Sequence, residues 1–477
     1  MKQFEGRQTK LYKILFLNFC FCVLSVQAAS DLQTIRGLGL PVVDVSTENG
    51  EMPTCDIVEH PEGCMGQGVT NINKVHGRLR IFQGDAILFD SGDYQKDSTG
   101  IMIRVRGNSS AWQDKKPYKI KLQKKADLLM RGDDEKYGDK EWLLIKDERV
   151  TLNTVIGLKV NELMQMQWTP AYCIVNLVLN GDYRGVYLLI ESVKRNNRCR
   201  LDVDKQTGYV FEYDPYWWNE DVYLETRFTE SLDAKFTFKV PNQNHITEEQ
   251  LKSLKNTLDN FENSLTSSGY QRYIDIESFA SWLLAQDILG NYDGHGSNVF
   301  MTKYDDTPQS RIRMANLWDF DAIMLTPDVW SNSHRILYFG TLLDHPDMLF
   351  EKAYKQKWNA VKKTLFHDLE SFLDSFADSD TGRAFDRSIP YDSERWGRTG
   401  KTLDELKAEA NAWFSRREQW LDSVINDYSA IDDIGSVNKQ TSIYDIQGRR
   451  LSSLPAQGIY IQDGRKRTVQ TKRIPLN

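Results

Sequence analysis

Residues 291–298 read Asn-Tyr-Asp-Gly-His-Gly-Ser-Asn, and residues 318–321 read Trp-Asp-Phe-Asp. An Asp is thus followed five residues later by an Asn, and further along the chain by a pair of Asp residues. Sites of phosphoryl transfer combine one Asp near the acceptor hydroxyl with Asn and Asp oxygens on a metal ion. Such oxygens are the hard ligands that Mg²⁺ prefers. The spacing predicts Asp293 as the catalytic residue, and a Mg²⁺ or Mn²⁺ site formed by Asn298, Asp319 and Asp321.

Other interpretations of these residues stay open on the sequence alone. Asp-Gly and Gly-Ser pairs mark ordinary turns, and carboxylate clusters often serve structure, for example in a Ca²⁺-stabilised loop. Asp293 and Asp319 could also be the carboxylate pair of a glycan-active enzyme, with some of the 12 Trp and 21 Tyr lining a sugar cleft. A further alternative is a surface or adhesion protein that keeps the fold without catalysis.

The length and composition indicate a folded protein of two or three domains. The chain has 477 residues, of which 40% are hydrophobic and 11% aromatic, enough to bury a substantial core. The net charge of −7 argues against general nucleic-acid binding, which depends on basic surfaces.

The N-terminus has the three parts of a secretory signal peptide. A basic start is followed by an apolar run over residues 14–26, and Val26-Gln27-Ala28 fits a small-residue cleavage site. The apolar run is shorter than the roughly 18 residues that a membrane span needs. Residues 1–28 are therefore predicted to be removed, leaving no transmembrane span. The expected location is secreted, periplasmic or at the cell surface.

Four cysteines lie beyond the predicted cleavage site, and an even number in an exported protein permits disulfides. Cys55 and Cys64 are close together in a stretch rich in Pro and Gly, so we expect them to pair. Cys173 and Cys199 form a second possible pair.

The order of the elements predicts an α+β protein in three parts. Residues 30–240 are β-rich, residues 241–430 are mainly helical, and residues 436–477 form a small, basic β tail. Local signals support this division. Asn180-Gly181 is a hairpin turn, and Thr247 with Gln250 forms a capping box at the start of a helix. Two such lobes imply a cleft, where ligands usually bind.

Two basic strands frame a turn in the β-rich part. Arg104 and Arg106 fall on one face of the first strand, and Lys119 lies on the second. The Gly/Ser-rich turn over residues 107–112, followed by Lys115, could cradle phosphates with its backbone N–H groups. The alternative is a solvated sheet face with its cations outward.

Glu191 ends an apolar strand. An ordinary solvated carboxylate is the simplest interpretation, but a kinase-like site also needs an acidic residue to orient its phosphate-binding lysine. Glu191 is the best-placed candidate for that role.

Four blocks of this sequence resemble the CotH (spore coat protein H) kinase family. They are residues 103–110 followed by 115–122, residues 179–191, residues 291–298 and residues 318–321. The resemblance implies an atypical, bilobal protein-kinase-like fold with a β-rich N-terminal lobe and a helical C-terminal lobe. It also implies transfer of the γ-phosphate of ATP to Ser or Thr of exported or surface proteins, with a divalent metal.

In this family the catalytic Asp would be Asp293, and Asn298 and Asp319 would be metal ligands. The nucleotide site implied by the resemblance comprises Arg106, Ser109, Lys115, Lys119 and Glu191. One departure is Thr151-Leu152-Asn153, where the family pattern leads us to expect an Arg-Asn pair. The basic tail resembles C-terminal sorting modules of exported Bacteroidetes proteins.

Overall fold

The computed structural model describes residues 32–430, except for residues 65, 71–72, 230–233, 268 and 295, and four short strands beyond residue 442. The predicted signal peptide, residues 1–28, lies outside the described residues. The chain divides into two compact units, one ending at Leu421 and one beginning at Asp422. The second unit contains a four-stranded antiparallel sheet in the order β17-β16-β18-β19 (Arg450–Leu451, Ile443–Tyr444, Gly458–Gln462 and Arg465–Val469).

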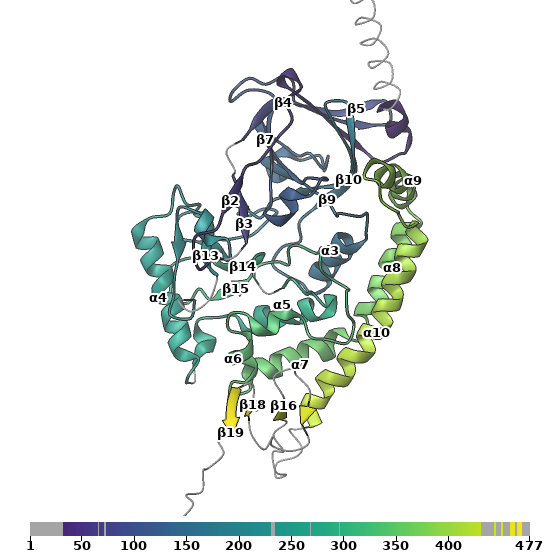
Figure 1. Ribbon diagram of the computed structural model, residues 1–477. Coiled ribbons are helices and arrows are strands. Elements are labelled where there is room, and N and C mark those ends of the chain that lie inside the picture. Colours follow the sequence, from purple (N-terminus) through teal and green to yellow (C-terminus); the bar gives the residue numbers. More distant parts are fainter. Residues whose placement is uncertain are drawn as a thin grey trace, which may run out of the picture. The chain divides into compact units, whose positions relative to one another are not determined.

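The β-rich part of the first unit is a closed barrel of seven strands (Figure 1). Pairing of β1 with β4 closes the ring, and β5 (Ala86–Asp90) extends β4 outside it. All neighbours are antiparallel except β1 and β9, which run parallel. In ring order the strands are β1 (Val42–Thr47), β9 (Tyr172–Leu179), β10 (Asp182–Glu191), β8 (Asp139–Ile145), β7 (Tyr118–Ala126), β6 (Ile101–Val105) and β4 (Val75–Gln83).

Alternating apolar residues fill the barrel, because successive side chains of a strand point to opposite faces. Ile101, Ile103 and Val105 of β6 are buried, while Met102 and Arg104 between them face outward. The predicted hairpin at Asn180 is confirmed, and it joins β9 to β10 with Asn180 in the left-handed region at φ 53°.

A second sheet has five strands in the order β12-β13-β11-β14-β15. The strands are β11 (Tyr209–Asp214), β12 (Tyr223–Leu224), β13 (Lys235–Val240), β14 (Val299–Lys303) and β15 (Ile312–Met314). Strand β14 starts directly after Asn298, and its antiparallel neighbour β15 ends shortly before Trp318. This pairing brings residues 291–298 and 318–321 to the same edge of the sheet.

Helices form more than half of residues 247–430. They are α4 (Glu248–Ser264), α5 (Ile276–Leu289), α6 (Phe339–Leu343), α7 (Leu349–Val361), α8 (Leu365–Ala377), α9 (Asp380–Arg395) and α10 (Leu403–Ala430), while α2 (Asp134–Tyr137) and α3 (Asn153–Leu163) lie within the β-rich part. The capping box of Thr247 and Gln250 is confirmed at the start of α4. Helix α5 is buried along most of its length and packs against α3 and α7.

Helix α9 packs against β9 and β10 of the barrel (Figure 1). Its Asp392 accepts hydrogen bonds from the Lys115 ammonium at 2.6 Å and from the backbone N–H of Val186 at 2.8 Å. Gly185 makes this approach possible, since a Cβ there would lie 2.1 Å from the Asp392 carboxylate. Lys115 is 1% exposed, so this ion pair ties the helix to the barrel from inside the protein.

The predicted disulfides are absent. All four of the described cysteines are free. Cys55 packs against the barrel core, with its thiol 3.9 Å from the carbonyl oxygen of Ala111. Cys64 lies at the other end of the ribbon formed by β2 (Ile57–Glu59) and β3 (Gln67–Val69). The prediction failed because closeness in sequence does not bring the two sulfurs together across an intervening strand.

The mixed α+β composition, with a β-rich region followed by a helical one, is confirmed. Closure of the β-rich region into a barrel was not predicted. Within the described residues, every helix is too short or too polar to span a membrane.

Replacing Asp392 by Ala should leave Lys115 buried without its counter-ion. Breaking a buried ion pair in this way costs about 3–5 kcal/mol, so we expect the free energy of unfolding, measured in urea, to fall by that amount. Asp374→Ala removes the exposed ion pair with Lys407 and should cost less than about 1 kcal/mol. Equal losses for the two variants would contradict the structural role of Asp392.

Candidate active site

The turn Trp318-Asp319-Phe320-Asp321 is held by helix α3. The backbone N–H of Leu317 donates to the side-chain oxygen of Asn161 at 2.7 Å. Phe320 is buried on Gly157, so closely that a Cβ at position 157 would lie 2.1 Å from the ring. Asp319 adopts the left-handed conformation at φ 63°. The buried ring thus anchors the turn, and the two carboxylates on either side of it remain accessible.

The stretch 291–298 follows the end of α5 and is shaped by its own side chains. The buried side chain of Asn291 accepts from the backbone N–H of Asp293 at 3.0 Å. Ser297 and Asn298 both have left-handed backbones, at φ 59° and 63°. Residues without the freedom of glycine seldom adopt this conformation, and such strain clusters at functional sites.

Backbone hydrogen bonds join the two stretches. The N–H of Tyr292 donates to Ala322 O at 3.0 Å, and the N–H of Met324 donates to Leu289 O at 2.9 Å. At the other end, the side-chain amide of Asn298 donates to the Asp319 carboxylate at 3.3 Å. The structure therefore brings Asn298 and Asp319 into contact. Asp293 and Asp321 are the chain neighbours of Tyr292 and Ala322, the two residues joined by the backbone hydrogen bond.

Negative charge accumulates at this site. Burial, followed by repulsion from Asp319 and Asp147, raises the pKa of Asp321 to about 8, and Asp293 adds to the effect. The Asp321 side chain still reaches solvent, which weakens both effects but does not reverse them. A cation beside Asp319 and Asp321 would relieve this repulsion.

The oxygen ligands fit a Mg²⁺ site in which the protein supplies only part of the coordination. Within the described ranges there is no group of three or more His, Cys, Asp or Glu residues arranged to hold a metal ion. Mg²⁺ needs only one or two carboxylates, because water and phosphate oxygens complete its octahedron. Asn298, Asp319 and Asp321 could supply that partial set.

Two cations face the carboxylates across a small cavity of about 50 Å³. The cavity is lined by Arg106, at the end of β6, and by Lys146, which follows β8, together with Asp319 and Asp321. Burial lowers the pKa of Arg106, whereas the charges of Asp319 and Glu212 raise it. Lys146 is 5% exposed, and burial lowers the pKa of its ammonium while Asp321 opposes the change.

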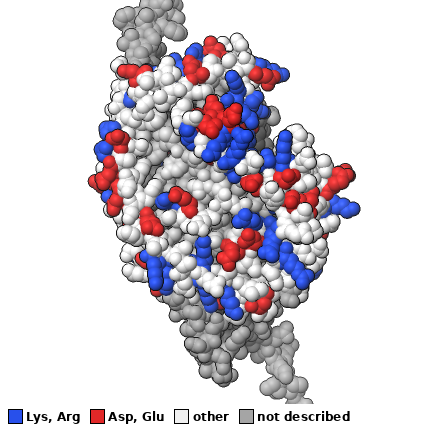
Figure 2. Space-filling model, turned by 180° about the vertical axis from the view of Figure 1, so that it is seen from behind, with Lys and Arg blue, Asp and Glu red and all other residues white. Residues whose placement is uncertain are grey.

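The other predicted nucleotide-binding residues lie elsewhere. Lys115 is engaged by Asp392, and Lys119 forms an ion pair with Glu141 at 3.0 Å on the outside of the barrel. Ser109 is exposed, and its neighbour Ser110 lines the cavity instead. Figure 2 shows basic side chains mixed with acidic ones over the upper part of the molecule, as expected for a solvated sheet face.

Glu191 is buried among arginines. Its carboxylate accepts from Arg131 at 2.9 Å and lies 3.5 Å from Arg200, and it also accepts from the backbone N–H of Ala171. Its described partners therefore include no lysine, which leaves the predicted lysine-orienting role without a contact to support it.

Sequence reasoning missed Lys146 and Glu212. Lys146 directly follows the apolar strand residues 142–145, and this was the available signal. Glu212 accepts from the backbone N–H of Asn298 at 2.8 Å and pairs with Lys239 at 2.8 Å. No local pattern reveals this role, because the contact crosses from β11 to the segment before β14.

Residues 151–153, where the sequence departs from the expected Arg-Asn pair, lie beside a carboxylate in the structure. Thr151 donates to the carboxylate of Asp147 at 2.5 Å, and Thr154 donates to it at 3.3 Å. Asp147 follows Lys146 directly, so the start of α3 fixes the segment that carries this lysine.

A family model described as CotH kinase protein matches residues 103–421, about two thirds of the chain. The chain therefore belongs to the CotH kinase family, and this membership implies an atypical kinase activity. A search of curated proteins finds no match.

Replacing Gly157 by Ala should displace Phe320 and, with it, both carboxylates. Overpacking of this kind costs about 1–3 kcal/mol, against a gain of up to about 1 kcal/mol in helix propensity. We expect a lower free energy of unfolding and weaker binding of Mg²⁺ with nucleotide, both measured by calorimetry. The double variant Gly157→Ala/Phe320→Leu should recover part of the stability, because the smaller side chain makes room. No recovery would contradict the packing account.

Proposed function

We propose that this protein transfers the γ-phosphate of ATP to Ser or Thr hydroxyls of other proteins, with Mg²⁺ or Mn²⁺. The observation that carries the proposal is the opposition of Arg106 and Lys146 to Asp319 and Asp321 across one cavity, with Asp293 on the adjoining segment. Phosphoryl transfer depends mainly on positioning and on the neutralisation of charge, and this arrangement offers both.

Each residue has a role that follows from its chemistry. Arg106 and Lys146 would hold phosphate oxygens, one with a planar guanidinium and the other as a point charge. Asn298, Asp319 and Asp321 would hold the divalent cation, which neutralises phosphate charge when bound. Asp293 is exposed and would orient the acceptor hydroxyl and take its proton. Glu212 would position Asn298 by accepting a hydrogen bond from its backbone N–H.

In the proposed kinase, the barrel would take the place of the N-terminal lobe. The cavity lies between the ends of barrel strands β6, β8 and β10 and the turn at residues 318–321, which α3 supports. At about 50 Å³ it is smaller than the roughly 300 Å³ at which small-molecule sites begin. We expect nucleotide binding to widen it.

The opposing cations also favour a kinase over a glycan-active enzyme. Hydrolysis of a glycosidic bond needs a pair of carboxyl groups but no facing Arg and Lys. The acceptors that we propose are exported or surface proteins, since the N-terminal sequence predicts export of this chain.

The proposal is tested by incubating the protein with γ-labelled ATP, Mg²⁺ or Mn²⁺, and an extract of surface proteins. Asp293→Asn should lower phosphate transfer by about 10²- to 10⁴-fold, the usual contribution of a positioned base, while nucleotide binding is retained. Lys146→Met should instead weaken nucleotide binding, seen as a smaller thermal shift with Mg²⁺ and ATP.

Asp85→Asn, at a turn between β4 and β5, serves as a matched control and should leave both measurements unchanged. Transfer that is the same in the wild type and Asp293→Asn would show that Asp293 is not the catalytic residue. Absence of any nucleotide-dependent thermal shift in the wild type would favour the non-catalytic alternative.

A further inference from the structure

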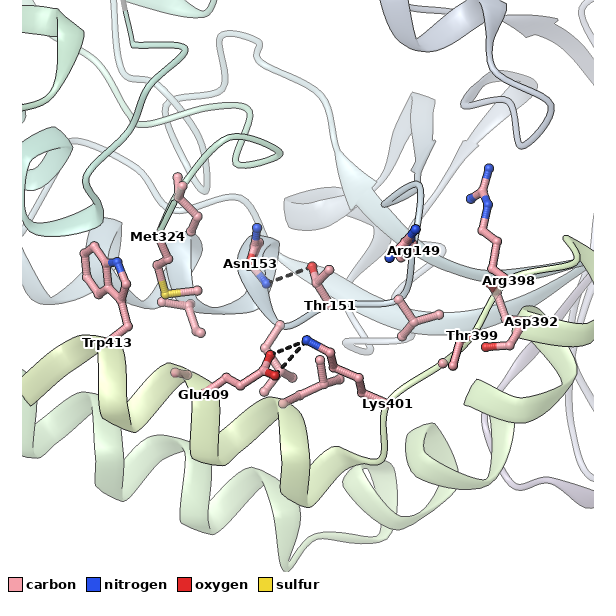
Figure 3. A pocket seen from close by; sticks show the side chains of 18 of the residues that line it. Arg149, Thr151, Asn153, Met324, Asp392, Arg398, Thr399, Lys401, Glu409 and Trp413 are labelled. Carbon is pink, nitrogen blue, oxygen red and sulfur yellow. Dashed lines mark hydrogen bonds and ion pairs between the residues drawn. The ribbon is translucent and has the colours of Figure 1, made fainter. Parts of the chain in front are cut away.

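A second and larger cavity, of about 310 Å³, lies beside the site just described. It is enclosed by the start of α3, by residues 323–325, by residues 398–401 and by the first turns of α10 (Figure 3). Its volume falls within the range of small-molecule and side-chain binding sites, which the first cavity does not reach. None of the roles proposed above uses it.

The walls of this cavity are largely apolar, and two buried donors on them, Trp413 Nε1 and Arg398 Nη1, have no hydrogen-bond partner among the described residues. Leu152, Ile156, Ile323 and Ala410 contribute apolar surface. Trp413 stands at one end, beside Met324 (Figure 3), and is only 8% exposed. Its indole N–H has no hydrogen-bond partner among the described residues. A buried donor left without an acceptor costs about 1–3 kcal/mol, so an occupant with a suitably placed oxygen would bind favourably.

The rim of the cavity carries one cation that is not neutralised. Lys401 pairs with Glu409 at 2.7 Å, and Asp392 is engaged by Lys115. Arg149, toward the end of the cavity away from Trp413 (Figure 3), is exposed and makes no ion pair with any described residue. The rim therefore favours a ligand with negative charge over one with positive charge.

The cavity adjoins the segments that carry Asp293 and Asp321. Its wall at residues 323–325 begins two residues after Asp321 and is hydrogen-bonded to the segment that leads to Asp293. Leu325 and Tyr292, both 63% exposed, extend the apolar surface beside these segments. Three extended residues of a polypeptide span about 10 Å. A bound peptide could therefore place one side chain in this cavity and its acceptor hydroxyl beside Asp293.

We propose that this cavity binds the acceptor polypeptide, taking a bulky apolar side chain that lies a few residues from the phosphorylated Ser or Thr and is followed by an acidic residue. The inference rests on the proposed function. The apolar side chain would fill the space between Ile156 and Ala410, a main-chain carbonyl would accept from Trp413, and the acidic residue would pair with Arg149. The cavity would thus select acceptors before transfer takes place.

Three fluorescent peptides test this proposal in direct binding measurements without nucleotide. Each peptide contains Ala in place of the acceptor Ser and carries one dipeptide, Leu-Asp, Gly-Asp or Leu-Lys, that begins three residues from this Ala. Each is made in two versions, with the dipeptide on the N-terminal or on the C-terminal side of the Ala. We expect the Leu-Asp peptide to bind at least fivefold more tightly than the other two in one of the two orientations. Equal binding of all three in both orientations would overturn the proposal.

Two variants locate the binding. Arg149→Glu should weaken binding of the Leu-Asp peptide about tenfold and remove the preference for Leu-Asp over Leu-Lys. Trp413→Phe, which keeps a ring but removes the donor, should weaken all peptides that contain Leu, and its melting temperature shows whether it is folded. Arg311→Glu makes the same charge change at another exposed arginine and should have no effect. Equal weakening by Arg149→Glu and Arg311→Glu would contradict the assignment.

The same peptides with Ser restored separate this inference from the proposed function. Selective binding without phosphate transfer by the wild type would retain the peptide site and reject the kinase activity. Transfer to all three peptides with equal KM would retain the kinase activity and reject the peptide site.

Discussion

The contact between Phe320 and Gly157 determines where the acidic turn lies, and the rest of the site depends on it. Helix α3 offers a gap at Gly157 that only the absence of a side chain provides, and the ring of Phe320 fills it. Asp319 and Asp321 flank this ring, so seating it directs both carboxylates toward the cavity at the end of the barrel. The same helix holds Leu317 through Asn161 and, through Thr154, the segment that carries Lys146. One short helix thus positions both the acidic and the basic wall.

The cavity brings charges of opposite sign together, with Arg106 and Lys146 on one wall and Asp319 and Asp321 on the other. Burial and the neighbouring carboxylates raise the pKa of Asp321 on one wall, and burial lowers the pKa of Arg106 and Lys146 on the other. A ligand that contains a divalent cation and phosphate oxygens would neutralise the negative charge of one wall and the positive charge of the other. The left-handed backbones of Ser297, Asn298 and Asp319 fit this view, because strain of this kind is retained where geometry matters for function.

Features with local signals were predictable from the sequence. The hairpin at Asn180 and the capping box at Thr247 depend on residues within four positions of each other, and helix α5 depends on apolar residues at helical spacing. From the sequence, Asn298 and Asp319 were assigned to one metal site, and the structure brings these two residues into contact. Helix α9 has a weaker local signal, because Gly382 and Pro390 lower its intrinsic propensity, and its packing against the barrel outweighs that cost.

Features that depend on distant contacts were not predictable. Lys115 was assigned to the nucleotide, but its partner Asp392 lies 277 residues away, and nothing near either residue indicates the pairing. Closure of the barrel likewise depends on β1 joining β4 and β9, and a strand pattern alone does not identify its neighbours. Lys146 was overlooked because a lysine after a strand is usually solvated, whereas here helix α3 and the acidic turn enclose it.

The central claim is that the acidic turn binds a divalent cation together with nucleotide phosphates. Electron paramagnetic resonance of Mn²⁺, titrated into the protein with and without ADP, tests it most directly. The account predicts a bound Mn²⁺ signal that strengthens with ADP, is lost in Asp319→Asn and persists in Asp293→Asn. Mn²⁺ binding that is indifferent to ADP, or that survives in Asp319→Asn, would contradict it.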